Sequence, residues 1–263
     1  MKVNVVIPAR NEERRLPSTL FSLFAQEGVE LSKVVVVDDG SSDRTVGVAK
    51  EFGVEVIRTN RRSETNLAGT PYMARVINLG LSRLMNVESD FTMILGADHL
   101  LPPYYLKEIT SRMMKEGVVV ASGIIEGEVA RKDIDVRGSG RVISTSWFKE
   151  VGYKYPENWG FEAWLVYKAL SMGKRVKVYR DLITRTQRKT ATSPIRYYYW
   201  GKGMRALGYH PLYSLGRATL IAVKDRVKGL YLLRGYLSRV DYYFDIKHFV
   251  KGYQTRLLLK LIL

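Results

Sequence analysis

Hydrophobic residues in this chain are gathered into short runs rich in valine and isoleucine, and these runs alternate with longer stretches of mixed polarity. Two early runs, Val3–Ile7 and Val34–Val37, are almost wholly apolar and are bounded by polar loops. Such runs are typical of strands buried on both faces of a parallel sheet. Between them, apolar residues at helical spacing predict a helix that begins near Glu12 or Pro17. The pattern therefore predicts a strand, a helix and a second, parallel strand.

The alternation continues along most of the chain. It predicts helices over about residues 43–52, 71–86 and 161–173, a helix that starts near residues 102–105, and strands at about residues 54–58, 91–95, 118–125 and 175–179. Strands that alternate with helices predict an α/β fold with a mainly parallel, doubly wound sheet. A chain of 263 residues, 46% of them hydrophobic, is long enough to bury the core of one catalytic domain with an appendage.

Positive charge is concentrated in the last third of the chain. The net charge is +16, and residues 183–263 contain 16 lysines and arginines against three acidic residues. Aromatic residues are interleaved with these cations, as in Tyr197–Trp200 and Tyr242–Phe244. Such a composition suits the surface of an anionic membrane, and nucleic acid is the rival partner. We expect residues 1–182 to form the catalytic domain and residues 183–263 to form a basic, helical tail at a membrane surface, where it also contributes to the acceptor side.

The same composition limits the location and the metal chemistry of the protein. No stretch approaches the roughly 18 uninterrupted apolar residues that a membrane-spanning helix needs, and the N-terminus lacks the layout of a signal peptide. We therefore expect a cytoplasmic protein, peripheral at the cytoplasmic face of the membrane. Because the chain has no cysteine, any metal must be held by oxygen or imidazole ligands, which fits Mg²⁺ or Mn²⁺.

Polar side chains follow three of the predicted strands. The loops read Pro8-Ala9-Arg10-Asn11-Glu12-Glu13, Asp38-Asp39-Gly40-Ser41-Ser42-Asp43-Arg44-Thr45 and Gly96-Ala97-Asp98-His99. In open α/β sheets, ligands bind outside the carboxyl ends of the strands, so these loops are the candidate site. For Ser41, Ser42 and Asp43, a structural role as a turn and helix N-cap explains the sequence as well as ligand binding does. Adjacent buried carboxylates need hydrogen-bond donors, which favours Asp39 as a contact of a nucleotide's base or ribose.

The segments Val5–Glu13, Val36–Thr45 and Leu95–His99, in this order and at these spacings, resemble the family 2 glycosyltransferases. The similarity extends through residues 69–80 and 137–152 to Trp159–Glu162, and so covers residues 1–190 approximately. The resemblance implies a GT-A type, Rossmann-like, mainly parallel sheet flanked by helices, with a basic, largely helical C-terminal extension. It also implies an inverting enzyme that moves a sugar from a UDP- or GDP-sugar to a lipid-linked or glycan acceptor.

Carried over residue by residue, the resemblance implies a donor site and an acceptor site. The nucleotide-sugar site comprises Pro8, Ala9, Arg10, Glu12, Asp39, Arg75, Ala97, Asp98 and Arg188. The acceptor site comprises Gly138, Ser139, Gly140 and Trp159. Arg188 lies in a segment with Arg185 and Lys189 that resembles the family's mobile cationic loop, although a solvated basic face explains these residues equally well. Trp159 suits a sugar-stacking platform or simple packing.

The resemblance implies that Asp98 holds a Mn²⁺ or Mg²⁺ ion that stabilises the departing diphosphate. The sequence departs from the family here, because Gly96 stands where the first acid of the Asp-x-Asp motif is expected. His99 follows Asp98 and is a candidate second metal ligand, a substrate contact or a loop residue. Imidazole suits Mn²⁺ better than Mg²⁺.

Inverting transfer to a hydroxyl group needs a base that accepts the proton of the acceptor. In the family this base is the Asp of a Glu-Asp pair at a helix start, and this chain has Glu162 and Ala163 there. Alignment on the following helix places Glu162 in the base position, whereas alignment on Glu162 and Trp164 places Ala163 there. We interpret Glu162 as the base, which together with Asp98 makes up the predicted catalytic pair. A lipid phosphate acceptor is already anionic and needs no base.

Three other functions fit parts of the sequence. Gly96 and Ala163 permit a non-catalytic, nucleotide-sugar-binding relative. The basic tail permits nucleic-acid binding, but it contains no recognisable nucleic-acid-reading motif. A sugar-1-phosphate nucleotidyltransferase shares the sheet type, but such enzymes carry a glycine-rich loop after the first strand, and Pro8–Glu13 has no glycine. We therefore predict a glycosyltransferase without a nucleic-acid partner and leave its oligomeric state open.

Overall fold

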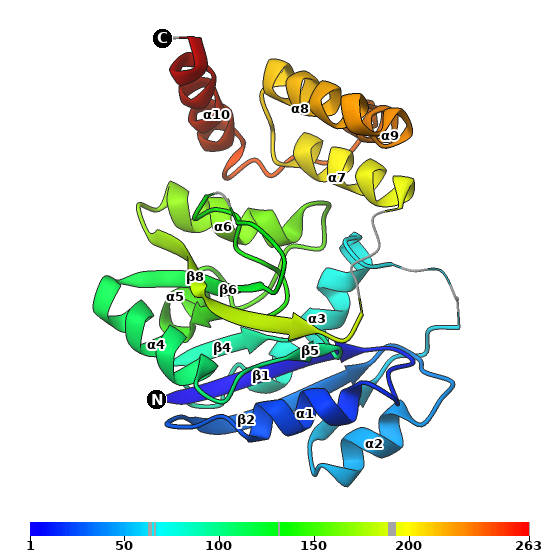
Figure 1. Ribbon diagram of the computed structural model, residues 1–263, viewed down its shortest axis with the longest axis vertical. Coiled ribbons are helices and arrows are strands. Elements are labelled where there is room, and N and C mark those ends of the chain that lie inside the picture. Colours follow the sequence, from blue (N-terminus) through cyan, green and yellow to red (C-terminus); the bar gives the residue numbers. More distant parts are fainter. Residues whose placement is uncertain (63–64, 66, 131, 189–192, 263) are drawn as a thin grey trace. The chain divides into compact units, whose positions relative to one another are not determined.

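The structure is a computed structural model that describes residues 1–62, 65, 67–130, 132–188 and 193–262 (Figure 1). The chain divides into two compact units. The first, which we call the sheet unit, comprises Met1–Thr65, Arg75–Lys154 and Gly173–Lys189. The second, which we call the helical unit, comprises Asn66–Ala74, Tyr155–Met172 and Thr190–Leu263. Each unit is described by itself.

The sheet unit is built on eight strands in the order β3-β2-β1-β4-β7-β6-β8-β5. Their bounds are β1 Lys2–Ala9, β2 Glu30–Asp38, β3 Glu55–Arg58, β4 Phe91–Ile94, β5 His99–Leu100, β6 Val118–Ile125, β7 Arg141–Ser144 and β8 Arg175–Thr186. Strands β3, β2, β1 and β4 are parallel neighbours, and β6 pairs in parallel with β8. Strand β7 runs antiparallel to β4 and β6, and β5 runs antiparallel to β8. The carboxyl ends of β1, β2 and β4 therefore lie at one edge.

Helices cover both faces of this sheet (Figure 1). Their bounds are α1 Leu16–Phe24, α2 Thr45–Glu51, α3 Pro71–Leu84, α4 Tyr105–Glu116 and α5 Thr145–Glu150. Val5 and Ile7 of β1 are fully buried in one apolar cluster with residues of α1, α2 and α4. Side chains alternate along a strand, so Val6 points to the other face. Gly80 of α3 packs there, where a Cβ would lie 2.5 Å from a methyl group of Val6.

The structure confirms the predicted α/β class and the predicted alternation of strands and helices. It adds three elements that the hydrophobic pattern did not indicate, namely β5, β7 and α5. The predicted domain boundary between residues 182 and 183 falls inside β8, which continues to Thr186. That boundary therefore lies within an element and not in a linker.

The helical unit contains α6 Phe161–Ser171, α7 Pro194–Ala206, α8 Pro211–Lys224, α9 Arg226–Leu237 and α10 Lys247–Ile262. The backbones of helices α7 and α9 approach each other closely at Gly235, where a Cβ would lie 2.0 Å from the Tyr198 carbonyl oxygen. Only glycine fits at this position. Several tyrosines bond to one another: the Tyr167 and Tyr209 hydroxyls are 2.9 Å apart, and Tyr236 donates to the Tyr209 carbonyl at 2.8 Å. None of the helices in the described part of the chain is both long and apolar enough to span a membrane.

Candidate active site

The loops after β1 and β2 are joined by reciprocal hydrogen bonds between side chains and backbone. Asn11, in the left-handed region at φ 52°, donates its backbone N–H to the Ser41 hydroxyl at 2.9 Å, and its side-chain oxygen accepts from the Ser42 N–H at 2.9 Å. The Thr45 hydroxyl accepts from the Glu12 N–H at 2.8 Å. These bonds satisfy backbone groups that neither strand nor helix engages. The two loops therefore form one connected rim at the sheet edge.

Two carboxylates of this rim are buried against arginines. Asp38 is fully buried, accepts from the Ser41 N–H and pairs with Arg58 at 3.1 Å. Asp39 is 2% exposed, pairs with Arg61 and accepts from the Thr59 hydroxyl at 2.9 Å. A buried carboxylate is costly without such donors. The donors expected from a ligand are thus supplied, in this structure, by Ser41 and Arg58 for Asp38 and by Thr59 and Arg61 for Asp39.

Gly40 is required where this segment crosses the rim. Its φ is 73°, and a Cβ there would lie 2.2 Å from the carbonyl oxygen of Arg61. Only glycine combines this backbone conformation with so close an approach. The glycine therefore fixes the position of Arg61 over Asp39.

Arg188 joins two other acids of the site. Its guanidinium lies 2.6 Å from Asp98 and 2.6 Å from Glu12, and Glu12 also pairs with Arg15 at 3.2 Å. Glu12 is almost wholly buried, and 16% of the Asp98 side chain is exposed. The backbone N–H of Gln187 donates to the Asp98 carbonyl at 2.8 Å. The segment after β8 therefore closes over the ends of β1 and β4 and brings Glu12, Asp98 and Arg188 together.

Ser139 occupies the space beside Gly96. Its hydroxyl accepts from the Gly96 N–H at 2.8 Å and lies 2.6 Å from Nδ1 of His99. A Cβ on Gly96 would lie 2.9 Å from that hydroxyl oxygen and 3.2 Å from the Asp98 carboxylate. A side chain at position 96 is therefore blocked by Ser139.

His99 lies beneath this serine and is 1% exposed. Burial, assisted by the positive charge of Arg137, lowers the pKa of His99 to about 4, so the ring is neutral at pH 7. Its Nε2 is buried and has no hydrogen-bond partner within the described chain, and a Cβ on Gly140 would lie 2.9 Å from the ring. Binding of a metal by His99 stays a prediction, which would have to use Nε2.

The described side chains around Asp98 are too few to coordinate a cation by themselves. Among the described residues, no three acidic or histidine side chains converge on one point. Asp98 is partly exposed, and its partner in the structure is itself a cation, Arg188. A divalent ion at Asp98 would therefore complete its coordination with ligand oxygens and water.

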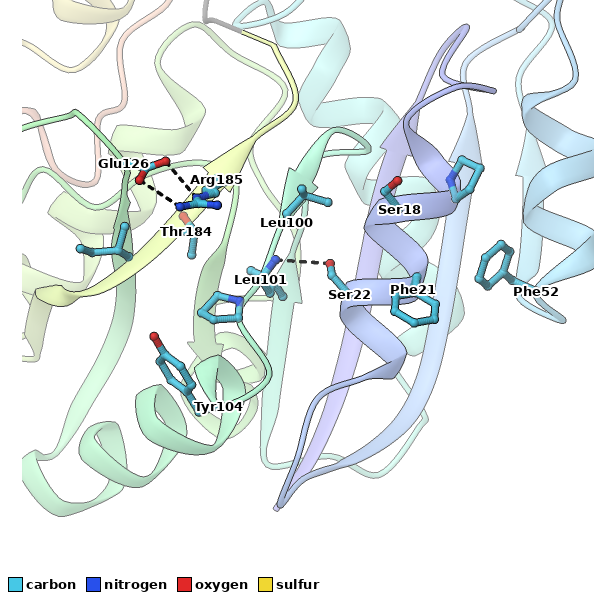
Figure 2. A pocket seen from close by; sticks show the side chains of 13 residues that line it. Ser18, Phe21, Ser22, Phe52, Leu100, Leu101, Tyr104, Glu126, Thr184 and Arg185 are labelled. Carbon is cyan, nitrogen blue, oxygen red and sulfur yellow. Dashed lines mark hydrogen bonds and ion pairs between the residues drawn. The ribbon is translucent and has the colours of Figure 1, made fainter.

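A separate, largely apolar groove of about 840 Å³ lies between α1 and the β5–β8 pair (Figure 2). Phe21, Phe52, Leu101 and Tyr104 line it, and an ion pair joins Arg185 to Glu126 at its side. Large apolar pockets are the usual candidates for ligand sites. This groove contains none of Glu12, Asp39 and Asp98, the acids that follow β1, β2 and β4. The nucleotide site at the ends of β1, β2 and β4 stays a prediction.

The family model of glycosyl transferase family 2 matches residues 4–181. The chain belongs to glycosyl transferase family 2. Over 54 residues it is 48% identical to 4,4'-diaponeurosporenoate glycosyltransferase of Staphylococcus haemolyticus, a match that covers 20% of this chain and 14% of that protein. The protein of the same name in Staphylococcus aureus strain USA300 is 42% identical over 55 residues, which cover 21% and 14% of the two chains. The matched segment is thus a small part of these curated relatives.

Solved structures share the fold at low sequence identity. The mannosyltransferase PcManGT from Pyrobaculum calidifontis, in complex with GDP-Man and Mn²⁺, superposes with a TM-score of 0.60 at 14% identity, covering 89% of this chain and 86% of its own. TarS of S. aureus gives 0.58 at 20% identity, covering 91% and 44%. Glucosyl-3-phosphoglycerate synthase of Mycobacterium tuberculosis gives 0.52 at 16% identity, covering 72% of each. These similarities concern the fold alone.

This family 2 member places most of the predicted donor-site residues near the rim. Pro8 and Ala9 end β1, and the Arg10 guanidinium donates to the Asp39 carbonyl at 3.3 Å. Ala97 is buried, and its carbonyl accepts from the Thr19 hydroxyl. Arg75 is exposed on α3. Lys189 lies outside the described residues. The ligand contacts of these residues stay predictions.

The predicted acceptor-side residues are divided between the two units. Gly138, Ser139 and Gly140 belong to the sheet unit, where the Tyr105 hydroxyl donates to the Gly140 carbonyl at 2.7 Å. Glu162 and Trp159 belong to the helical unit. Glu162 is exposed in the first turn of α6.

Trp159 has partners within the helical unit. Its ring lies 5.1 Å from that of Tyr199, and the Lys202 ammonium lies 4.4 Å from its centroid. Packing and a cation–π contact thus account for this side chain.

The sequence did not identify three arginines that form ion pairs with the acids of the site. Arg61 pairs with Asp39, Arg58 with Asp38 and Arg15 with Glu12. Two adjacent buried carboxylates were a signal that cations lie nearby, but the sequence offers many arginines and does not say which ones fold back.

Proposed function

We propose that this protein is an inverting glycosyltransferase that moves a sugar from a UDP- or GDP-sugar to an acceptor. The observation that supports this most is the cluster of Glu12, Asp98 and Arg188 beside the buried Asp39, at the carboxyl ends of β1, β2 and β4. A nucleoside diphosphate needs a polar group for the base and ribose, and cations for its phosphates. Asp39 would offer the former by exchanging its pairing with Arg61 for the ligand, and Arg188 would offer one of the latter.

We further propose that Asp98 binds Mn²⁺ or Mg²⁺ together with the donor diphosphate. When bound, such an ion would stabilise the negative charge that develops on the leaving diphosphate. Arg188 would exchange its ion pairs with Glu12 and Asp98 for the phosphates, because a guanidinium binds phosphate in a bidentate manner. Complexes of similar folds with GDP-Man and Mn²⁺ support this assignment.

On the acceptor side, Glu162 would accept the proton of an attacking hydroxyl. We propose a lipid-linked or glycan acceptor and a protein that works at the cytoplasmic face of an anionic membrane. If the acceptor is a hydroxyl, Glu162→Gln lowers kcat about a hundredfold or more and leaves donor affinity unchanged. An unchanged kcat would mean that the acceptor is already anionic or that Glu162 is not the base.

Thermal unfolding with UDP-, GDP- and dTDP-sugars, with and without Mn²⁺, tests the donor proposal. A donor at a hundred times its Kd stabilises the folded state by about 2.7 kcal/mol, which raises Tm by roughly 5–10 °C in a protein of this size. Asp98→Asn should remove the part of the shift that depends on metal. No shift with any of the donors would overturn the proposal.

Arg188→Gln should weaken the donor-dependent shift, and its matched control is Arg180→Gln, which removes a surface arginine from β8. Arg180 pairs with Asp133 at 3.0 Å and is about as exposed as Arg188. The control variant should keep the full donor shift. A non-catalytic relative, which Gly96 and Ala163 permit, would show the shift but release no nucleoside diphosphate in the presence of any acceptor.

A further inference from the structure

The aromatic residues that characterise the basic tail are not its main exposed apolar surface. Tyr236 and Tyr243 of the tail are 6% exposed, and Tyr209 packs edge to face against Tyr213 and against Tyr167 of α6. Phe244, which is 71% exposed, is an exception. The strongly exposed apolar side chains of α8 and α9 are mainly aliphatic: Leu212, Leu215, Leu220, Val223, Val227, Leu230 and Leu237. The tail therefore presents a different apolar surface from the one that its composition suggests.

Helices α8 and α9 form an antiparallel hairpin around Asp225. Ala218 and Leu232 lie seven residues on either side of Asp225 and belong to one buried cluster. Asp225 caps α9 by accepting from the Lys228 N–H. On α8, the buried residues Ser214 and Ala218 lie on the side opposite Leu212, Leu220 and Val223, as a period of 3.6 residues requires, and Leu215 lies on the flank. The aliphatic residues thus face away from the core of the helical unit.

The aliphatic side chains of the hairpin are unusually exposed. Val223 is 81% exposed, Leu220 72% and Leu230 65%. Single exposed apolar residues need no explanation, but several on the outer sides of two adjacent helices mark an interaction surface. Helix α8 has 14 residues and so is about 21 Å long, which is shorter than a hydrocarbon core of about 30 Å. The hairpin is suited to lying along a bilayer.

Cations are interspersed with the aliphatic residues along the hairpin. Residues 211–237 contain Arg217, Lys224, Arg226, Lys228 and Arg234 against one acid, Asp225. Asp225 is paired with Lys228 at 2.9 Å, and within the described part of the chain no ion pair joins the other four cations to an acid. Long cationic side chains can keep their charges at anionic headgroups while their stems lie on apolar surface. Two copies of this face would repel each other, which argues against a dimer interface.

We infer that the outer face of the α8–α9 hairpin is the surface by which this protein binds an anionic lipid bilayer, with the aliphatic side chains entering the headgroup region and the cations contacting lipid phosphates. The inference rests on the membrane association that we propose and names the surface responsible. It does not depend on glycosyl transfer.

Flotation of the full chain with vesicles tests the inference. The protein should bind vesicles of equal parts phosphatidylglycerol and phosphatidylcholine and should bind pure phosphatidylcholine much more weakly. Leu220→Asn/Leu230→Asn should weaken binding to the anionic vesicles about tenfold or more. The matched control Met114→Asn/Val129→Asn changes residues of the sheet unit that are 64% and 83% exposed, and it should bind as the parent does.

A charge variant separates the contribution of the cations to membrane binding from that of the aliphatic side chains. Arg217→Gln/Lys224→Gln should weaken binding to anionic vesicles about fivefold for each charge removed and leave the weak binding to neutral vesicles unchanged. Circular dichroism and donor-induced thermal shifts show that the variants are folded and that the donor site is intact, so failure of the donor proposal is recognised separately.

Three results would overturn the inference. The first is no binding of the anionic vesicles by the parent, and the second is equal binding of these vesicles by the parent and by Leu220→Asn/Leu230→Asn. The third is a parent that is dimeric in light scattering and becomes monomeric in the leucine variant, because the face would then join two copies of the chain.

Discussion

At the scale of single residues, the position of Ser139 accounts for the glycine at position 96, where the Asp-x-Asp motif has its first acid. Its hydroxyl holds the Gly96 N–H and contacts His99, and so occupies the space that a carboxylate at position 96 would need. The strand-end turn is thus fixed by a serine from a distant segment. The loss of the acid and the presence of the serine are two parts of one local arrangement.

This arrangement predicts the outcome of restoring the acid. Gly96→Asp alone should lower Tm by roughly 3–10 °C, because its Cβ meets the Ser139 hydroxyl and such overpacking costs about 1–3 kcal/mol. Gly96→Asp/Ser139→Gly should recover most of the loss and should bind Mn²⁺ more tightly than the parent. Thermal unfolding and metal titration measure both effects. Additive losses in the double variant would show that Ser139 is not the obstacle.

Arg188 has opposite expected effects on metal and on donor. Its charge lies 2.6 Å from Asp98, so it opposes a cation there, yet it is suited to bind the diphosphate. Arg188→Gln should therefore raise affinity for Mn²⁺ alone a few fold and lower affinity for the donor with Mn²⁺ about tenfold or more. Calorimetric titration of each ligand distinguishes the two. If both affinities move in the same direction, Arg188 does not exchange partners.

At the scale of elements, the strand-end rim depends on the bonds between the loops after β1 and β2. Asp43 accepts from the backbone N–H groups of Glu13 and Thr45 at 3.1 and 3.0 Å. Burial acts to raise the pKa of Asp43, but these bonds and the one from the Thr45 hydroxyl outweigh it, and the pKa is lowered. A carboxylate with a lowered pKa stabilises the fold above the pKa of the unfolded chain, and this stabilisation is lost as pH falls through the folded pKa.

Asp43→Ala should therefore lower Tm by a few degrees at neutral pH, in line with the loss of about 1 kcal/mol when a capping side chain is removed. The difference from the parent should stay constant down to about pH 4 and shrink below it, because the parent's carboxylate then becomes protonated. Scans of Tm between pH 3 and pH 7 measure this. A difference that grows in acid would contradict the assignment.

The sequence predicts most elements of the sheet because their apolar runs are buried on both faces, as in β1 and β2. It does not predict β7, because that strand begins with a charged residue. Arg141 is 1% exposed, and its guanidinium donates to the carbonyls of Arg137 and Val136. Such burial depends on a loop that folds back. Strand β5 has two residues and no pattern of its own.

In the candidate site, the sequence predicts the acidic residues but not all of their partners. The motif loops place Glu12, Asp39 and Asp98 at one sheet edge, since parallel strands share a direction. The sequence does not indicate that Arg61 lies over Asp39, because Arg61 follows its strand in a polar segment without periodicity. It indicates Arg188 only through the resemblance to the family. Local pattern thus predicts the acids, whereas their partners depend on how loops close in three dimensions.

At the scale of the whole molecule, the uneven charge raises the question of which polyanion the chain binds. Nucleic acid and an anionic membrane both attract a tail with 16 basic and three acidic residues. Binding to DNA rests on counterion release and falls steeply with salt. Binding to a membrane through the α8–α9 hairpin adds burial of aliphatic side chains, which salt does not screen. The dependence of binding on salt concentration therefore distinguishes nucleic acid from a membrane as the partner.

We expect any non-specific binding of the parent protein to DNA to be lost almost completely between about 0.05 and 0.5 M NaCl, whereas a measurable part of its binding to anionic vesicles should remain. Leu220→Asn/Leu230→Asn should leave DNA binding unchanged at low salt, because it removes no charge, and should lose the salt-resistant part of vesicle binding. Filter binding and flotation at matched salt concentrations measure these quantities. If vesicle binding falls with salt as steeply as DNA binding does, charge alone holds the protein to the membrane and the aliphatic face serves another contact.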